Sequence, residues 1–386
     1  MNKTSLSFAA LRTRQKRANR VHSKYMAARA LFTNQISSRL AVVGKHHRMA
    51  RNDSSTVPID SAFDRQSTAS LQESFFGSMR LPSALDSGFE EALRHVLSNP
   101  GSMVRPRMVL RVAAAYGVDA EAAHNVAFAL EYFHTASLIF DDLPCMDNAL
   151  ERRGVACVHV EYGESSAILS ALALINRAYA LVWRAVASCP AQSRHEVMDY
   201  IEKRLGVDGL LNGQSLDLHY SSLPHTQETT ERIALGKTVS LIRLTLVLPA
   251  MLGGAPAREI QLLERIAACW GLGYQIIDDL KDVLQSETET GKTAARDETL
   301  DRPNIAGAIG ICGAVERLER LMRIGDRTLR HLLVHRPGLA FLSKLRSDLE
   351  GELRQVTDCA LRDPYREGGV SGAADLARET STKEQP

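Results

Sequence analysis

Residues 137–148 read Ser-Leu-Ile-Phe-Asp-Asp-Leu-Pro-Cys-Met-Asp-Asn, and they join the end of an apolar run to a group of carboxylates. The run before them, residues 120–136, carries apolar residues at helical spacing. We therefore predict a long helix that delivers Asp141 and Asp142, with Asp147 close behind, to one end of a helical bundle. Buried like charges repel one another, so such a group needs cations. By itself, the pattern is equally that of an acidic loop at a helix end.

A second stretch, residues 273–282, repeats the pattern as Gly-Tyr-Gln-Ile-Ile-Asp-Asp-Leu-Lys-Asp. Asp278 and Asp282 share one helix face because they are four positions apart, and Asp279 lies beside them. Two carboxylate helices in one chain can hold cations between them. Oxygen ligands favour magnesium, which binds through few carboxylates together with substrate phosphates. The two clusters therefore predict a magnesium site for a diphosphate.

The spacing of apolar residues is helical along much of the chain. The further runs with this spacing are residues 89–97, 108–116, 231–251, 259–280 and 314–334. Breakers such as Asn99-Pro100-Gly101 separate them, and no segment alternates polar and apolar residues with a bias to β-branched side chains. The predicted fold class is all-α, with long helices around a central cavity.

The two ends of the chain differ in composition from the middle. Residues 1–70 are rich in Arg, Ser and Ala, and we predict a basic head outside the fold. The head resembles an organellar transit peptide, and the alternative is a true start at Met26 or Met49. Residues 71–362 form the predicted catalytic domain and residues 363–386 a polar, flexible tail. The expected location is the cytoplasm for a bacterial protein, or an organelle if the head directs import.

Composition argues against several classes of protein. The net charge of +2 is too small to indicate a nucleic-acid partner. The six cysteines show no CxxC pairing, which argues against a disulfide framework or zinc site and favours a reducing compartment. The most apolar stretch, residues 167–189, is interrupted by Asn176, Arg177 and Arg184, so we expect a buried or amphipathic helix and no transmembrane span.

These residues together resemble the trans-isoprenyl diphosphate synthase family, and within it the geranylgeranyl diphosphate synthase type, over roughly residues 80–355. Residues 141–147 are close to the family's first aspartate-rich motif, DDxxxxD, and residues 278–282 match its second, DDxxD. Residues 213–217, Gly-Gln-Ser-Leu-Asp, resemble its GQxxD motif, and Lys237-Thr238 resembles its KT motif. The resemblance implies an isoprenoid-synthase-like bundle, a homodimer and a prenyltransferase activity.

The resemblance also implies the reaction and the roles of particular residues. An allylic diphosphate, farnesyl or shorter, would be joined to isopentenyl diphosphate to give geranylgeranyl diphosphate, with the departing diphosphate as the base. About three magnesium ions would be held by Asp141, Asp142, Asp147, Asp278, Asp279 and Asp282. The substrate-binding residues would be Arg105, His134, Arg152, Arg153, Gln214, Lys237 and Lys292, with Ser102 at the isopentenyl diphosphate site. The catalytic residues Lys237, Thr238 and Gln275 would stabilise the carbocation through carbonyl and amide dipoles.

Two departures from the family pattern concern cations. The family's GGKxxRP reads Pro-Gly-Ser-Met-Val-Arg-Pro at residues 100–106, so Arg105 is kept but Ser102 replaces a lysine. We expect weaker binding of isopentenyl diphosphate, without loss of chemistry. Arg302 takes the place of a lysine further along the chain.

Product length would depend on residues just before the first aspartate motif. Ala136 and Ser137 lie five and four positions before Asp141, and both are small. The resemblance places the growing chain beneath this motif, so small residues here would allow a product of geranylgeranyl length or somewhat longer. The alternative is that Phe133 or Phe128 forms the floor of the channel.

Three other functions are compatible with the same residues. The chain could be a non-catalytic partner subunit of a synthase dimer; the complete aspartate motifs argue against this, while the serine at position 102 leaves it open. It could be a terpene cyclase, although the paired arginines Arg152 and Arg153 and the two matched aspartate motifs favour the synthase. The third alternative is a helical scaffold that binds ligands without catalysis.

Overall fold

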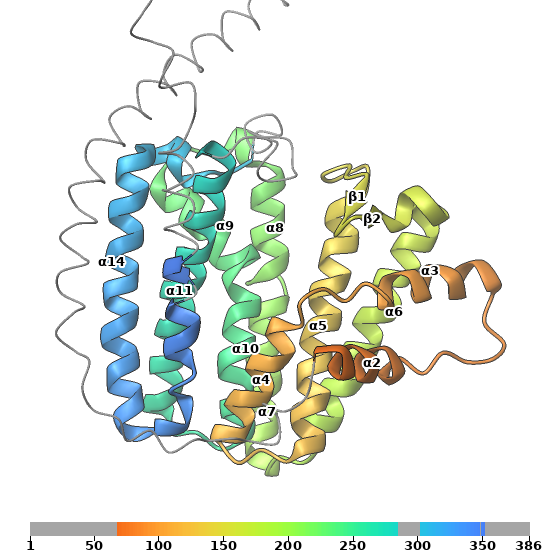
Figure 1. Cartoon of the computed structure of the whole chain (residues 1–386), viewed down its shortest axis with the longest axis horizontal. Helices are drawn as coiled ribbons and strands as arrows, with labels where there is room; N and C mark the ends of the chain where they lie inside the picture. The colour runs from red at the N-terminus through yellow and green to blue at the C-terminus, as the bar shows by residue number, and fades with distance from the viewer. Residues whose placement is uncertain (1–67, 285–301, 348, 352–386) are drawn as a thin grey trace, which may run out of the picture.

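The computed structural model describes residues 68–284, 302–347 and 349–351, and in these the predicted all-α class is confirmed (Figure 1). The α-helices, in chain order, are α2 (Thr68–Ser78), α3 (Ser87–Leu97), α4 (Val104–Ala115), α5 (Ala120–Asp142), α6 (Val158–Ala187), α7 (Ala191–Leu205), α8 (Leu210–Leu218), α9 (Gln227–Lys237), α10 (Val239–Leu252), α11 (Ala257–Leu284) and α14 (Ile305–His335). Short 3-10 turns η2 (Tyr220–Ser222) and η3 (Pro337–Leu339) follow α8 and α14. Between α5 and α6, strands β1 (Glu151–Arg152) and β2 (Val155–Ala156) pair in an antiparallel hairpin.

The helices that carry the aspartate motifs are bounded by local signals. Asp119 caps α5, because its carboxylate accepts hydrogen bonds from the N–H groups of Glu121 and Ala122. Helix α5 ends at Asp142, just before Leu143-Pro144. Asn304 caps α14, with its side chain accepting from the N–H of Gly307 at 3.1 Å.

The structure differs from the sequence prediction in several elements. The prediction of a single helix over 231–251 is wrong. The chain breaks at Thr238, and α9 and α10 meet there at a bend of 48°. Helices α7 and α8 and the hairpin were not predicted. Helix α2 begins at Thr68, inside the predicted head. The rest of that head and the tail from residue 363 lie outside the described residues.

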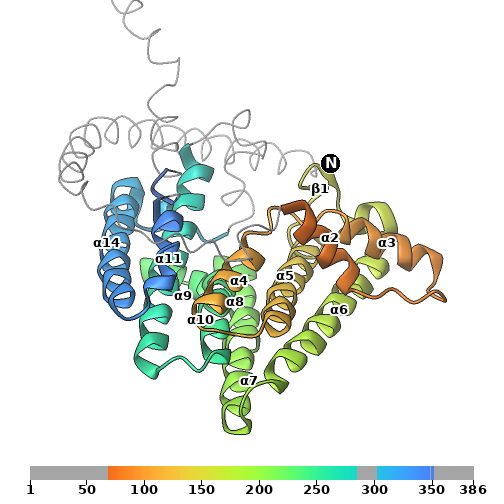
Figure 2. The ribbon, with the colours of Figure 1, turned by 60° about the horizontal axis from the view of Figure 1, so that its bottom comes forward.

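Helix α10 connects the two halves of the bundle. It contacts α4, α5 and α7 on one side and α11 on the other (Figure 2). One apolar cluster surrounds α5 and includes Leu244 and Leu248 of α10. A second cluster lies between α11 and α14 and includes Leu246 and Val247 of α10. Because α10 contributes to both clusters, the helices ending in the two aspartate motifs are held in one packed body.

Two expectations drawn from composition concern membrane spans and cysteines. By length and composition alone, α6 could cross a membrane, as could the bent pair α9 and α10. This is weak evidence, because a core helix of a globular protein passes the same test. Cys145, Cys157, Cys189, Cys269 and Cys312 are free thiols, and Cys359 lies outside the described residues.

Candidate active site

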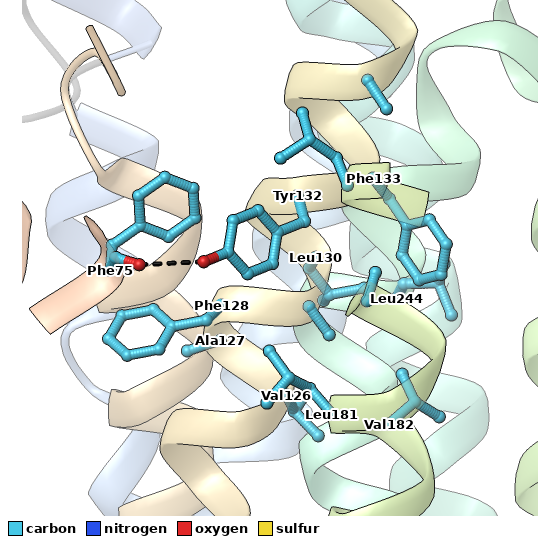
Figure 3. Close-up of a cluster of buried hydrophobic side chains, with 14 of the residues drawn as sticks. Phe75, Val126, Ala127, Phe128, Leu130, Tyr132, Phe133, Leu181, Val182 and Leu244 are labelled. Atoms are coloured by element: carbon cyan, nitrogen blue, oxygen red, sulfur yellow. Dashed lines mark hydrogen bonds between the residues drawn. The ribbon is translucent and has the colours of Figure 1, made fainter. Parts of the chain in front are cut away.

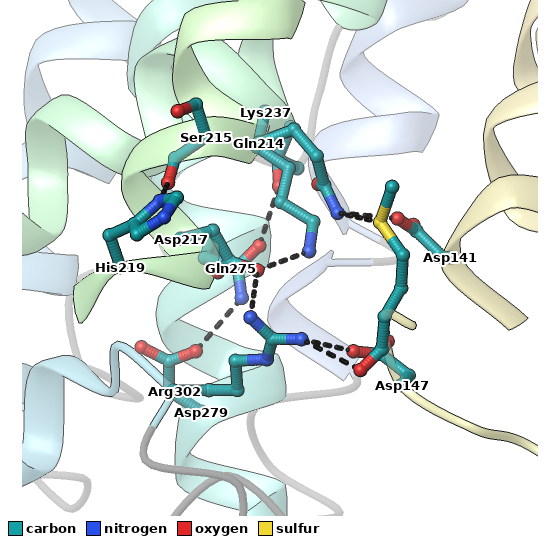
Figure 4. Close-up of polar contacts among 12 residues, drawn as sticks. Asp141, Asp147, Gln214, Ser215, Asp217, His219, Lys237, Gln275, Asp279 and Arg302 are labelled. Carbon is teal, nitrogen blue, oxygen red and sulfur yellow. Dashed lines mark hydrogen bonds and ion pairs between the residues drawn. The ribbon is translucent and has the colours of Figure 1, made fainter. Parts of the chain in front are cut away.

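A polar cavity of about 270 Å³ lies where the two aspartate-bearing helices end (Figure 4). Its lining includes Asp147 after α5, and Asp278 and Asp279 of α11. The cationic residues in the lining are Arg152, Lys237 and Arg302, and the lining also includes Thr238 and Gln275. The structure thus brings the two sequence clusters, which are more than a hundred residues apart, to one cavity.

Each aspartate of the first cluster has a different neighbour. Asp142 is buried and accepts a forked interaction from the Nε and Nη2 of Arg152. Asp141 accepts a hydrogen bond from the Gln214 amide at 2.7 Å. Asp147 accepts one from the Nη2 of Arg302 at 2.6 Å.

The three carboxylates of the second cluster differ in exposure. Asp278 is exposed where it lines the cavity. Asp279 is 1% exposed, and its two oxygens accept from the N–H of Ile305 at 2.7 Å and the amide of Gln275 at 2.9 Å. Asp282 is partly buried and does not line the cavity. Asp279 therefore joins the start of α14 to α11 as well as facing the site.

Lys237 and Thr238 reach the cavity because the chain breaks between α9 and α10. Helix α8 crosses α9 so closely that a Cβ on Gly213 would lie 2.3 Å from the backbone nitrogen of Lys237. This contact brings Asp217 within 2.7 Å of the Lys237 ammonium. Burial would lower the pKa of Lys237, but Asp217 and Asp141 outweigh burial and raise it, so the lysine stays charged.

Gln275 is held by hydrogen bonds at both ends of its side-chain amide. The Thr238 hydroxyl donates to its oxygen at 2.8 Å, and its nitrogen donates to Asp279. Helix α9 ends at Lys237, directly before Thr238, and a helix carboxyl end carries partial negative charge. This part of the cavity can therefore stabilise positive charge.

A group of basic residues lies beside Asp142 and Arg152, and it consists of Arg105, His134 and Arg153. Burial, followed by the positive charges of Arg105, Arg153 and Arg152, lowers the pKa of His134 to about 2, so its ring is neutral. Glu131 is buried there as well, and burial raises its pKa even though Arg105 and Arg153 oppose the shift. Such a group favours a polyanion.

The loop that carries Ser102 closes over Arg153. Gly101 has φ +78°, and a Cβ there would lie 2.6 Å from the Arg153 guanidinium carbon. Arg153 in turn donates to the Asn99 carbonyl at 2.8 Å. Ser102 itself is exposed, and its carbonyl accepts from Arg107. The side chain at the position of the family's lysine is thus open to solvent.

Below the first motif, the aromatic side chains of α5 point to two sides (Figure 3). Phe128 and Tyr132 turn toward Phe75 of α2, and the Tyr132 hydroxyl donates to the Phe75 carbonyl. Phe133 instead packs edge-on against Tyr179 of α6, with ring centroids 5.0 Å apart. Ala136 is fully buried, and Ser137 lies one helical turn above Phe133.

The residues around the cavity fit a hard divalent cation. The aspartates offer only oxygen ligands, which magnesium prefers. Burial raises the pKa of Asp141 to about 6; Lys237 opposes the shift, while Asp147 and Asp217 add to it. In the part of the chain that the structure describes, no three acidic, His or Cys side chains are grouped closely enough to hold a metal ion, and Asp142 and Asp147 pair with Arg152 and Arg302. A bound cation would relieve the repulsion among these carboxylates.

The sequence alone does not assign a role to three residues of the site. Asp217 ends the GQxxD-like stretch, but in the structure it contacts both Lys237 and Arg302. Arg302 is recognised in the sequence only as the replacement of a lysine. Glu131 has no predicted role, because its burial among arginines depends on packing that local sequence does not show. Lys292 lies outside the described residues.

Solved structures identify the class of protein. A crystal structure of a geranyltransferase from Helicobacter pylori, complexed with magnesium and isoprenyl diphosphate, matches with a TM-score of 0.62 and 26% identity, over 79% of this chain and 100% of that one. An FPP/GFPP synthase from Zymomonas mobilis matches with a TM-score of 0.59 and 29% identity, over 69% of this chain and 90% of that one. The fold is that of the isoprenoid synthases.

Sequence comparison names the family. Residues 86–323 match the model of the polyprenyl synthetase family. Geranylgeranyl pyrophosphate synthase 9, chloroplastic, of Arabidopsis thaliana is 36% identical over 245 residues, which are 62% of this chain and 68% of that protein. The chloroplastic geranylgeranyl pyrophosphate synthase of Capsicum annuum is 36% identical over 240 residues, 62% of this chain and 65% of that one. The chain belongs to the polyprenyl synthetase family, as a prenyltransferase of the geranylgeranyl diphosphate synthase type.

Proposed function

We propose that this enzyme condenses an allylic diphosphate, farnesyl or shorter, with isopentenyl diphosphate to form geranylgeranyl diphosphate and release diphosphate. The main observation behind the proposal is that residues of both aspartate motifs line the same cavity, together with Arg152, Lys237 and Arg302. Carboxylates and cations around one space suit a metal-bound diphosphate better than a neutral substrate. The names of the sequence relatives support the product.

Magnesium is the proposed cofactor, held by Asp141, Asp142, Asp147, Asp278, Asp279 and Asp282 as in the sequence hypothesis, with about three ions. The all-oxygen donor set supports it, as does the magnesium in the Helicobacter pylori structure. Bound magnesium would neutralise negative charge on the departing diphosphate. The residues with the most freedom to bind metal directly are Asp141 and Asp278, because Asp142 and Asp279 already hold Arg152 and the start of α14.

The allylic substrate would lie with its diphosphate against Arg152 and Lys237 and its reacting carbon near Thr238 and Gln275. Helix α9 ends at this space, since Lys237 and Thr238 line the cavity, and its carboxyl end carries partial negative charge. Gln275 is fixed by Thr238 and Asp279, so its dipole needs little reorientation when positive charge develops. Gln214 would act through its hydrogen bond to Asp141.

Isopentenyl diphosphate would bind at the basic group of Arg105, His134 and Arg153. A neutral His134 can donate one hydrogen bond to a phosphate oxygen, and the arginines supply the charge. Ser102 would border this site without adding charge, and Lys292 would add charge from outside the described residues. The proton lost from this substrate would pass to the departing diphosphate.

The product chain would extend beneath the first motif, past Ala136 and Ser137. The contact of Phe133 with Tyr179 favours Phe133 as the floor, since Phe128 is turned to α2 instead. Ser137 and Phe133 share one helix face, so a chain passing Ser137 would meet Phe133 next. This geometry supports a geranylgeranyl-sized product.

A homodimer is part of the proposal. Helix α6 presents Ile168, Leu172, Tyr179 and Trp183 on one face, and Leu172 and Trp183 are 50% and 60% exposed. An apolar stripe on one long helix can pair with the same stripe of a second copy around a two-fold axis. Organellar import stays a prediction for the basic head, and the plant relatives named above are chloroplastic.

One assay tests the function. The purified protein is incubated with magnesium, farnesyl diphosphate and labelled isopentenyl diphosphate, and the length of the extended product is measured. Geranylgeranyl diphosphate is the expected product. A matched reaction with the metal chelated should give none, and Asp278→Ala should give much less.

Two results would support other functions. Extension only after a second synthase subunit is added would indicate a partner subunit, the alternative that the serine at position 102 leaves open. A cyclic hydrocarbon formed without isopentenyl diphosphate would indicate a terpene cyclase. Either result would replace the proposed function.

A further inference from the structure

Arg302 lies between two carboxylates that come from different parts of the chain (Figure 4). Its Nη2 is 2.6 Å from Asp147, the last residue of the first aspartate motif, and its Nη1 is 3.5 Å from Asp217 of α8. Nη2 also donates to the Met146 carbonyl at 3.4 Å. The side chain is 11% exposed, so it is not an ordinary solvated surface arginine.

The packing of α14 holds Arg302 in this place. Asn304 donates to the Asp279 carbonyl at 3.1 Å, and the N–H of Ile305 donates to the Asp279 carboxylate. These bonds fix the backbone two and three residues after Arg302. The guanidinium can therefore turn about its own side chain while its Cα stays beside the cavity.

The charges in the cavity explain why a resident cation is needed. Among the described residues, four carboxylates (Asp147, Asp217, Asp278 and Asp279) and three cationic side chains (Arg152, Lys237 and Arg302) line it. Without Arg302, Asp147 and Asp217 would face each other across a poorly solvated space, and their repulsion would be costly. The forked guanidinium can bridge two carboxylates, as a divalent cation can.

On the basis of the proposed function, we propose that Arg302 is an internal counter-ion that takes the place of a divalent cation at Asp147 and Asp217 in the ligand-free site and turns to the diphosphate when metal and substrate bind. Asp147 is one of the proposed metal ligands, and Arg302 holds one of its two oxygens at 2.6 Å. Arg302 therefore competes with metal in the free enzyme and assists the diphosphate in the loaded one. Arg302 would thus set the order of binding, because metal enters more easily together with the polyanion that accepts the guanidinium.

This role predicts effects of opposite sign when the guanidinium is removed. In Arg302→Gln, the ligand-free enzyme should bind Mn²⁺ about fivefold more tightly, as expected for loss of a competing ion pair in a partly buried site. Inorganic diphosphate with Mg²⁺ should bind about tenfold more weakly, because a charge-assisted contact is lost. An arginine that only supports the fold would weaken both when removed.

The experiment compares the wild type with Arg302→Gln, Arg302→Lys and Arg336→Gln. Arg336 forms an ion pair with Glu259 at 3.1 Å at the far end of α14, so it is a matched control away from the cavity. Mn²⁺ binding to the ligand-free proteins is measured by the EPR signal of free Mn²⁺, and diphosphate binding by calorimetry. Arg336→Gln should match the wild type in both. Arg302→Lys keeps the positive charge but loses the forked guanidinium group. Its affinities for Mn²⁺ and for diphosphate should fall between those of the wild type and Arg302→Gln.

Equal or weaker Mn²⁺ binding by Arg302→Gln, or by Arg302→Lys if the glutamine variant does not fold, would overturn the counter-ion role. A different result would overturn the proposed function itself: no Mn²⁺ or diphosphate binding by the wild type and by Arg336→Gln. The two failures are therefore distinguishable.

Discussion

Asp141 is destabilising in the metal-free protein, and this determines how stability responds to pH. Its pKa is raised from 3.8 to about 6, mainly by burial, so the folded protein holds this proton more tightly than the unfolded chain. Stability from this group is present at low pH and is lost as pH rises through about 6. Above that pH the charged carboxylate costs up to about 3 kcal/mol.

Asp141→Asn should therefore stabilise the metal-free protein while removing activity. We expect the free energy of unfolding at pH 7.5 to rise by about 1 to 3 kcal/mol. The difference from the wild type should disappear below about pH 4, where the carboxyl is protonated in both states. Urea unfolding in the presence of a chelator measures this. A variant less stable than the wild type at pH 7.5 would contradict the sign.

Ser102 is the residue at which a single side chain would change substrate affinity. It is exposed on the loop that closes over Arg153, so a lysine there would fit without repacking and add a positive charge. We expect Ser102→Lys to lower the KM for isopentenyl diphosphate by about threefold to tenfold, with kcat little changed. Ser102→Gln is the control for side-chain size. An unchanged or higher KM in the lysine variant would contradict the hypothesis that Ser102 weakens the binding of isopentenyl diphosphate.

At the scale of elements, the contact between α11 and α14 passes through one carboxylate. Asp279→Ala would leave the N–H of Ile305 and the amide of Gln275 without their acceptor in a buried place. We expect a loss of about 2 kcal/mol in the free energy of unfolding, together with a fall in kcat. Asp278→Ala, at the exposed neighbour, should lower kcat without lowering the melting temperature. Equal melting temperatures for the two variants would mean that Asp279 does not support α14.

The packing of α5 on α6 is expected to set product length. Phe133→Ala should open the channel beneath Ser137 and lengthen the main product, at a stability cost of about 3 kcal/mol. Phe128→Ala removes a similar aromatic ring from the α2 side and should leave product length unchanged. Chromatography of the hydrolysed products compares the two. Longer products from both variants would show that general loosening of α5, and not a floor at Phe133, controls length.

At the scale of the whole molecule, the apolar face of α6 is the proposed dimer contact. Leu172→Arg places a charge in the middle of this face and should shift the protein to a monomer in light-scattering measurements. Val334→Arg is the matched control, since Val334 is 77% exposed on α14, at the other side of the bundle (Figure 1). Dissociation by both variants, or by neither, would place the contact elsewhere.

Helical periodicity by itself determined the fold class and the place of each aspartate motif. Apolar residues three and four apart put Asp141 and Asp278 at the ends of buried helices, and this pattern is local to each stretch. Together with the resemblance, it was enough to predict the family and most of the residues that line the cavity. The break at Thr238 and the short helix α8 were missed, because both depend on neighbours distant in sequence.

Only the tertiary structure decided how the charges pair. Lys237 reaches Asp217 because two glycines, Gly213 and Gly236, let α8 and α9 approach closely, and no local pattern specifies that contact. Arg302 reaches Asp147 across more than a hundred and fifty residues because Asp279 anchors the start of α14. Residue spacing determines which face of a helix a carboxylate occupies, whereas packing between helices determines which cation it meets.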